Sequence, residues 1–215
     1  MQTGRHNAYT LYASRERTRV MKKSEQTEAT TKKLRDVGRA LFAERGFAGV
    51  PAEEIVRAAG VTRGALYHHF NGKDGLFEAV TIDALNEIQA LIMTAVRRHD
   101  DPWVGFVAGC MAFLEAICRP GLQRIVIVEA PAVLGIERWR SLDDSLSEWF
   151  LRESVEELID EGLMISHSAG AVTNLLTGAM NEAALWIAGQ PDRNQALIQS
   201  KDALHSILAG LRDDD

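Results

Sequence analysis

From Thr30 onwards, apolar residues recur along the chain at the spacing of an α-helix, and no sustained alternating run indicates a β-hairpin. The first apolar stripe occupies positions i, i+3, i+4, i+7 and i+8, which are Leu34, Val37, Gly38, Leu41 and Phe42. We expect this helix to end at Gly46 in a left-handed conformation, with Phe47 folding back onto it. The pattern predicts an all-α protein.

Short helices are predicted to follow the first one. Pro51 suits the first turn of a second helix that ends at Gly60, and Thr62 suits the N-cap of a third helix of barely two turns. Asn71 is placed to cap a long fourth helix that runs to about residue 98.

The remainder of the chain continues in the same way. A helix rich in large apolar residues begins after Asp101 and breaks at Pro120. Residues 125–128 have the composition of a strand, but without a partner strand we expect a short buried helix there. Three more helices are expected over residues 137–161, 169–189 and 192–211.

Composition and charge narrow the class of protein. The chain has 215 residues, which is long enough for a sizeable core. Its residues are 46% apolar and 25% charged, and this composition excludes disordered and fibrous proteins. Residues 1–24 carry six basic side chains against one acidic one, whereas residues 81–215 carry 10 basic and 21 acidic side chains. We expect residues 1–26 to form a basic, flexible arm that faces a polyanion. The alternative is a disordered tail ahead of a true start at Met21.

Cysteine and membrane signals indicate a cytoplasmic protein. On a shared helix Cys110 and Cys118 would lie about 12 Å apart, beyond the roughly 7 Å limit for a disulfide, which suits a reducing compartment. The longest apolar stretch, residues 103–118, is too short to span a bilayer and carries Glu115. We therefore expect no membrane partner.

The most informative segment is the pair of short helices on either side of Gly60, because this arrangement is typical of a helix-turn-helix. The second helix of such a motif places its N-terminal residues against base edges in the DNA major groove. Arg63 can pair with a guanine edge, and Gly64 lets backbone and bases approach closely. Tyr67 and His68 have the reach for phosphates, and Lys73 at the next helix start can grip a phosphate. Alternatively, Arg63 is only a solvated surface residue.

Sequence motifs in the same segment resemble the TetR family of bacterial transcriptional regulators. These motifs are ALFAERGFAG at 40–49, EEIVRAAG at 53–60 and VTRGALYHHFNGKDGLF at 61–77. The resemblance implies that the recognition helix and phosphate clamp are Thr62, Arg63, Gly64, Tyr67, His68 and Lys73. The family usually has Thr or Ser near positions 50–51, where this chain has Val50 and Pro51. The side-chain cap of the second helix should therefore be missing or replaced by backbone N–H groups.

Dimerisation is expected because one recognition helix reads only one half-site. The last two helices offer small and apolar stripes for it, and the resemblance implies that they pair as a four-helix bundle. The candidate dimerisation residues are Leu175, Ala179, Ala183, Trp186, Leu197, Leu204 and Leu208. The alternative is that both stripes are buried within one subunit.

A small-molecule effector is the second expected partner. The middle helices carry more aromatic and soft side chains than a minimal core needs, and in TetR-like proteins this region holds an inducer. The candidate ligand-binding residues are Trp103, Phe106, Cys110, Phe113, Ile117, Glu129, Trp139, Trp149, Phe150 and Met180. For any one of them core packing is the alternative, and for Glu129 it is a capping or ion-pair role.

Catalytic and metal motifs are absent from the sequence: it contains no HExxH, CxxC, GxSxG, P-loop or GxGxxG. We expect no enzyme activity, no metal and no cofactor. The sequence thus predicts a helix-turn-helix domain at 27–73 and a larger helical ligand-binding and dimerisation domain at 74–215. Together they would form a homodimeric, ligand-responsive repressor that binds operator double-stranded DNA. The competing interpretation is an all-α small-molecule-binding protein or enzyme without sequence-specific DNA binding.

Overall fold

A computed structural model gives the arrangement of the chain. It describes the backbone of residues 4–143, 149–165 and 167–213, and the side chains of these residues except 4–24, 143 and 149. Within this part of the chain the regular elements are helices, and one isolated β-bridge pairs Met164 with Arg212. The prediction of an all-α fold is confirmed.

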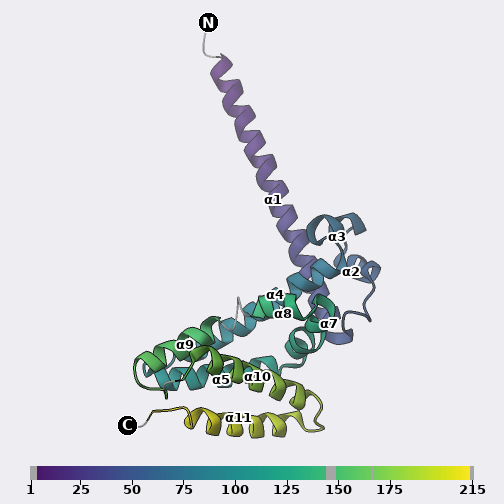
Figure 1. Cartoon of the computed structure of the whole chain (residues 1–215). Coiled ribbons are helices and arrows are strands. Elements are labelled where there is room, and N and C mark those ends of the chain that lie inside the picture. Colours follow the sequence, from purple (N-terminus) through teal and green to yellow (C-terminus); the bar gives the residue numbers. More distant parts are fainter. Residues whose placement is uncertain (1–3, 144–148, 166, 214–215) are drawn as a thin grey trace.

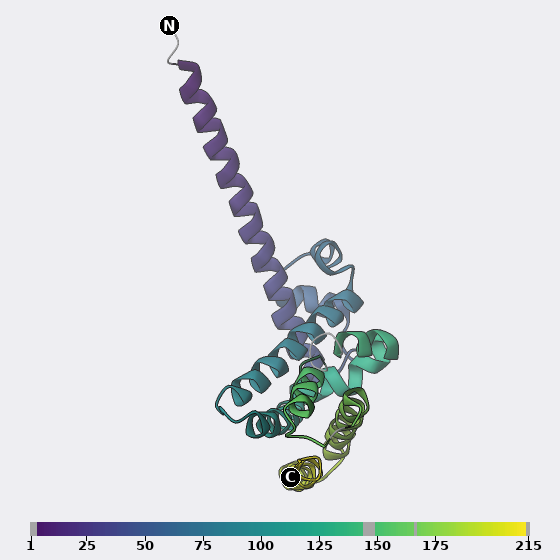
Figure 2. The ribbon, with the colours of Figure 1, turned by 60° about the vertical axis from the view of Figure 1, so that its left-hand side comes forward.

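The N-terminal part contains a long helix and two short ones, α1 (Gly4–Arg45), α2 (Ala52–Ala59) and α3 (Arg63–Phe70). The C-terminal part of α1 packs with α2 and α3 around side chains with no exposed surface, Leu34, Phe42, Ile55 and Leu66. The other end of α1 projects away from the molecule as a rod (Figures 1 and 2). Residues 4–26 of the expected arm form this projecting end.

The helix α4 (Lys73–Val96) links this part to the rest of the molecule and lies along α5 (Pro102–Ile117). By length and composition alone, α4 is apolar enough to cross a membrane, as are α5 and the segment Pro120–Leu134 if counted as one span bent by 76°. In the fold, however, α4 is a core helix, because Leu76, Phe77 and Ile88 are fully buried.

A short turn, α6 (Pro120–Leu122), is followed by the π-helix η1 (Gln123–Glu129) and by α7 (Ala130–Leu134). The strand-like composition of residues 125–128 thus belongs to a helix, as expected, and Ile125 and Val126 are buried. The π winding was not expected. Such wider turns are rare and frequently mark functional sites.

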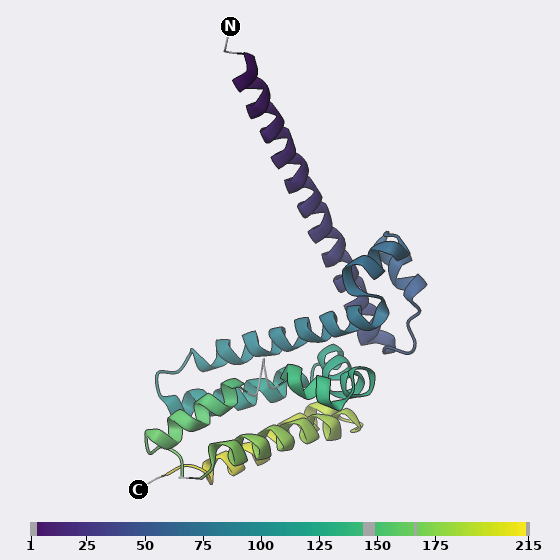
Figure 3. The same cartoon turned by 45° about the horizontal axis from the view of Figure 1, so that its top comes forward.

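The C-terminal elements are α8 (Ile136–Asp143), α9 (Trp149–Asp160), α10 (Ala169–Ala188) and α11 (Arg193–Ala209). The single helix expected over 137–161 corresponds to α8 and α9, and residues 144–148 between them lie outside the described part. Ser168 and Asp192 cap α10 and α11 by accepting hydrogen bonds from the backbone N–H groups of Ala171 and Gln195. The two helices form the face of the molecule opposite the projecting end of α1 (Figure 3).

The loop between α1 and α2 joins the two parts of the molecule through Phe47. Its ring packs edge-on against Phe77 of α4, with centroids 5.2 Å apart, and lies 5.9 Å from the Phe42 ring. The ammonium of Lys73 lies 3.8 Å from the centroid of the Phe47 ring. It donates hydrogen bonds to the carbonyls of Phe47 and Val50 at 3.0 and 3.2 Å. Lys73 therefore fixes the loop to the start of α4.

The π-helix η1 holds the same loop from the other side. Glu129 accepts a hydrogen bond from the N–H of Phe47 at 3.2 Å, and Arg124 donates to the carbonyls of Ala43 and Glu44 at the end of α1. Gly46 adopts φ 73°, as expected for a left-handed helix end. We call Gly46, Phe47, Lys73, Arg124 and Glu129 the junction.

Substitution of Gly46 tests the junction. Gly46→Ala should lower the free energy of unfolding by about 1–3 kcal/mol, because alanine at positive φ is strained and its Cβ would collide with the Glu129 carboxylate. Chemical denaturation measures the change. Gly170→Ala is the control, because its Cβ would meet no atom nearer than 3.9 Å. Equal stability of the two variants would contradict the packing described here.

Substitution of Lys73 tests how much its hydrogen bonds to the carbonyls of Phe47 and Val50 stabilise the fold. Lys73→Met should lower the free energy of unfolding by about 1.5–3 kcal/mol, the usual contribution of hydrogen bonds to a charged group. Lys32→Met is the matched control, because Lys32 forms an exposed helix-surface pair with Asp36 at 2.6 Å, and such pairs contribute only about 0.3–0.5 kcal/mol. If Lys73→Met were as mild as Lys32→Met in thermal or chemical denaturation, Lys73 would not stabilise the loop.

Candidate nucleic-acid interface

The turn between α2 and α3 has the geometry of a helix-turn-helix. Gly60 ends α2 in the left-handed region, with φ 65° and ψ 36°, and its N–H donates to the carbonyl of Arg57 at 3.2 Å. Thr62 then caps α3, because its hydroxyl accepts a hydrogen bond from the N–H of Ala65 at 3.2 Å. The turn therefore sets α3 on the surface as a separate short helix.

One side of α3 is buried and the other faces solvent. Leu66 and Phe70 pack in the core. The exposed side carries the expected contact residues, which we call the reading head: Thr62, Arg63, Gly64, Tyr67 and His68. At Gly64 an added Cβ would meet nothing nearer than 3.8 Å, so this part of the helix surface is open. The structure thus brings five of the six expected DNA-contact residues together on one exposed surface.

Within the reading head, Arg63 already has partners. Its Nη1 lies 2.8 Å from Oε1 of Glu53 in the first turn of α2, and its guanidinium lies 5.6 Å from the centroid of the Tyr67 ring. The hydrogen bond with Tyr67 and, after it, the charge of Glu53 raise the pKa of Arg63 above its ordinary value. The sequence analysis did not predict the contact between Arg63 and Glu53. The sequence does contain a signal for it, because Glu53 lies in the first turn of the second helix, ten residues before Arg63.

The sixth residue, Lys73, lies in the junction rather than on the surface of α3. Two of the three hydrogen-bond donors of its ammonium bind the loop carbonyls described above. The expectation for Val50 and Pro51 is confirmed, because Pro51 caps α2 without any side-chain hydrogen bond. The N–H of Glu54 instead donates to the carbonyl of Pro51 at 3.1 Å.

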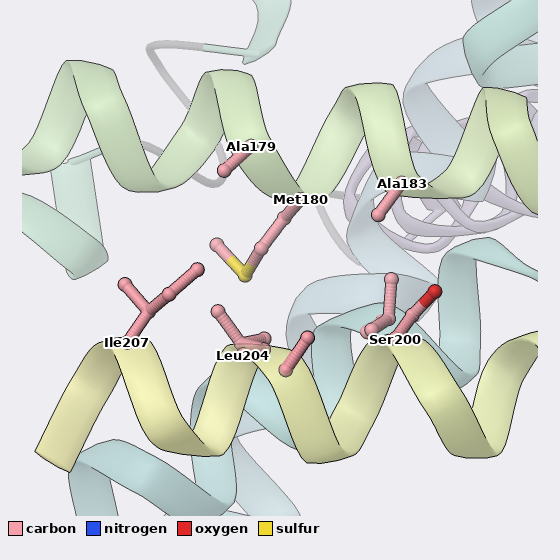
Figure 4. Close-up of a pocket in the computed structure, with 8 residues that line it drawn as sticks. Ala179, Met180, Ala183, Ser200, Leu204 and Ile207 are labelled. Atoms are coloured by element: carbon pink, nitrogen blue, oxygen red, sulfur yellow. The ribbon is translucent and has the colours of Figure 1, made fainter.

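Two of the expected ligand residues line different cavities. Trp103 lines a cavity of about 270 Å³ between α5 and α11, together with His205 and Arg212. Met180 lines a separate cavity of about 140 Å³ between α10 and α11, shown in Figure 4. Phe106, Cys110 and Ile117 are buried, and Phe113, Trp139 and Phe150 are half-buried, all in core contacts. The side chain of Trp149 lies outside the described part.

Glu129, one of the expected ligand residues, binds the main chain of the loop after α1. The Glu129 carboxylate caps the N–H of Phe47, which is the capping alternative considered from the sequence.

Burial raises the pKa of Cys110 to about 12 and that of Cys118 to about 11. Both thiols are free and protonated at neutral pH, which disfavours a nucleophilic or metal-binding role. In the part of the chain that the structure describes, no group of three or more His, Cys, Asp or Glu could hold a metal ion.

The expected dimerisation residues divide into two groups. Leu175, Ala179 and Trp186 are exposed on α10, and Ala183 and Leu197 are half-buried. The placement of Leu204 and Leu208 on the dimerisation face is corrected, because both are buried within the subunit. The apolar stripe of α11 that was taken for an interface is its inner side.

The sequence analysis also missed several exposed apolar side chains of α10 and α11. Leu185, Ile198 and Ile207 are large apolar side chains with 42–53% of their surface exposed. Ile207 and Leu175 border an open, mainly apolar groove of about 620 Å³. The period of 3.6 residues places Leu197, Leu204 and Leu208 on one side of α11, and the sequence alone does not tell whether that side faces the core or a partner.

Comparisons with known proteins agree with this geometry. Residues 34–80 match the family described as "Bacterial regulatory proteins, tetR family", and residues 103–211 match "Tetracyclin repressor-like, C-terminal domain". A TetR-family transcriptional regulator from Pectobacterium atrosepticum, of known crystal structure, is 34% identical. The match covers 87% of this chain and 96% of that chain, with a TM-score of 0.74.

Two curated relatives extend the comparison. The HTH-type transcriptional regulator SrpR of Pseudomonas putida is 26% identical over 202 residues, covering 89% of this chain and 90% of SrpR. The transposon Tn10 TetC protein of Escherichia coli is 29% identical over 157 residues, covering 72% of this chain and 78% of TetC. This chain belongs to the TetR family of DNA-binding, helix-turn-helix transcriptional regulators.

Proposed function

We propose that this chain is a ligand-responsive repressor that binds an operator as a homodimer and leaves it when a small-molecule inducer binds. The observation that carries the proposal is the exposed reading head, held by a capped turn on a well-packed three-helix core. A side chain that served only packing would be buried, whereas Arg63 and its exposed neighbours on α3 meet solvent.

Each residue of the reading head has a separate role in the proposal. Arg63 reads a guanine edge in the major groove, and Gly64 lets the helix backbone approach the bases. Thr62, Tyr67 and His68 bind phosphate oxygens, which fixes the helix in the groove. Lys73 uses its remaining donor on a phosphate while it holds the loop, so its contact adds affinity without base preference.

Homodimerisation completes the proposed operator contact. Exposed Leu175, Leu185 and Trp186 on α10 and Ile207 on α11 offer the apolar surface that a second copy would cover. A symmetric pair of reading heads then meets two half-sites separated by whole turns of DNA. The basic N-terminal segment adds contacts to the DNA backbone, because six of its side chains are cationic.

The inducer in this proposal binds among the aromatic and soft side chains of α5, α8, α9 and α10. It must bind the DNA-incompetent conformation more tightly, and such coupling is usually about 1–3 kcal/mol. The π-helix η1 supports this, because it contacts both parts of the chain. Glu129, at the C-terminal end of η1, accepts a hydrogen bond from Phe47 in the loop after α1, and Arg124 donates to carbonyls in the last turn of α1. Gln123, next to Arg124, donates to the carbonyl of Ala184 on α10 at 2.6 Å.

The remaining assignments follow from this function. We assign residues 27–73 to DNA binding and 74–215 to effector binding and dimerisation, so that the boundary lies in the first turn of α4, whose N-cap is Gly72. The site of action is the cytoplasm, where the DNA lies, and the two free thiols suit that reducing compartment.

Substitution of Arg63 tests the reading head. Duplexes bound by the full chain are first selected from a random pool, and binding is then measured at fixed salt. Arg63→Ala should weaken operator binding by about 1–3 kcal/mol and relax preference at one base pair per half-site. Arg98→Ala is the control, because it removes an exposed cation at the far end of α4. Equal operator affinities of wild type and Arg63→Ala would refute the proposed reading role.

Substitution of Leu175 tests the dimer. Leu175 is 74% exposed in the subunit, so Leu175→Glu leaves the fold intact but would bury an unpaired carboxylate in the interface. We expect the dimer dissociation constant, measured by analytical ultracentrifugation, to rise by at least about 30-fold, the effect of a central interface residue. The control is Ile136→Glu, which changes an apolar side chain that is 50% exposed on α8. An unchanged dissociation constant for Leu175→Glu would place the interface elsewhere.

A further inference from the structure

The arginine of the reading head has an acidic partner that belongs to another helix. Nη1 of Arg63 and Oε1 of Glu53 are 2.8 Å apart, and both side chains are more than 60% exposed. The neighbouring acid, Glu54, binds Arg45 of α1 instead, at 2.7 Å. Of these two adjacent carboxylates, Glu54 ties α2 to α1 and Glu53 acts on the reading head.

Stability does not explain the pair of Glu53 and Arg63. An ion pair between two solvent-exposed side chains contributes little to folding, because water and salt screen it. A carboxylate on a surface that meets DNA also opposes binding, since it approaches the phosphates of the duplex. Folding stability therefore gives no reason for placing Glu53 next to Arg63.

The guanidinium has enough donors to bind Glu53 and a base together. It carries five N–H groups in a rigid planar fork, and the carboxylate uses the Nη1 side. Tyr67 lies against the same group, with its hydroxyl 3.5 Å from Nη2 and its ring 5.6 Å from the guanidinium carbon. Two neighbours thus limit the rotation of a side chain that would otherwise sample many rotamers.

We propose that Glu53 is a specificity-determining positioning residue for Arg63, holding its guanidinium toward one base pair and weakening binding to non-cognate DNA. This inference rests on the proposed function of the reading head. At the operator, a guanidinium already held by Glu53 loses less rotational freedom when it binds the guanine edge. At other sequences this gain is absent while the repulsion between Glu53 and the phosphates remains, so the ratio of operator to non-cognate affinity increases.

The experiment compares Glu53→Ala and Glu53→Gln in the full chain. Dissociation constants are measured at fixed salt for the selected operator, for operators with single base-pair changes and for a non-cognate duplex. Glu53→Ala should bind the non-cognate duplex more tightly and lose about tenfold of the operator preference, within the range of one bidentate base contact. Glu53→Gln keeps an acceptor oxygen for Arg63 and should recover part of that preference.

Two controls separate positioning from a change in net charge or stability. Glu54→Gln removes the same charge one residue away and should keep the base-pair preference of the wild type. In an Arg63→Ala background, Glu53→Ala should cause no further loss of preference, because the coupling between the two residues is already broken. Thermal unfolding of each variant verifies that it is folded at the temperature of the binding assay.

The outcomes distinguish the inference from the function on which it rests. The inference is overturned if Glu53→Ala keeps the full preference at the base pair read by Arg63. It is also overturned if Glu54→Gln has the same effect, or if the loss persists without Arg63. If the wild type selects no operator, or if Arg63→Ala binds like the wild type, the proposed function fails as well.

Discussion

The hydrogen bonds around Phe47 are the constraint on which the arrangement of this molecule depends. Its carbonyl accepts from Lys73 at the start of α4, its N–H donates to Glu129 of η1, and its ring packs against Phe77. Without these contacts, the short connection between α3 and α4 would let the three N-terminal helices move against the rest of the chain. Here main chain and side chain of one residue are both held, so the orientation of α3 is linked to the helices behind it.

For the function proposed above, this linkage would supply a physical route between the effector and the DNA. The π-helix η1 contacts the loop after α1 through Glu129 and the α10 backbone through Gln123, whose side chain also accepts from Arg193. In the proposed function, a shift of α10 would pass through η1 to the loop after α1, which belongs to the same three-helix unit as the reading head. Packed elements of this kind move between discrete arrangements rather than deforming continuously.

Local signals in the sequence predicted the DNA-reading part well and the packing of the far end poorly. Thr62, Gly60 and the apolar spacing of α3 act through neighbouring residues, so the cap, the turn and the buried side of α3 were all predictable. Whether the side of α11 with Leu208 or the side with Ile207 is buried depends on α5 and α10, which are distant in sequence. The contacts of Lys73 and Glu129 with Phe47 were not predicted for the same reason, because they join segments 26 and 82 residues apart.

The position of Arg124 and Glu129 has a consequence for recombination between regulators. Their partners are the main-chain groups of Ala43, Glu44 and Phe47, so the contacts require a glycine at 46 and a particular end to α1 more than particular side chains. Consider a chimaera that joins these three N-terminal helices to the C-terminal domain of another regulator. It would keep the junction only if that domain had a basic and an acidic residue where Arg124 and Glu129 lie in this chain. Exchange of the helix-turn-helix alone, with the π-helix left in place, is the better-tolerated graft.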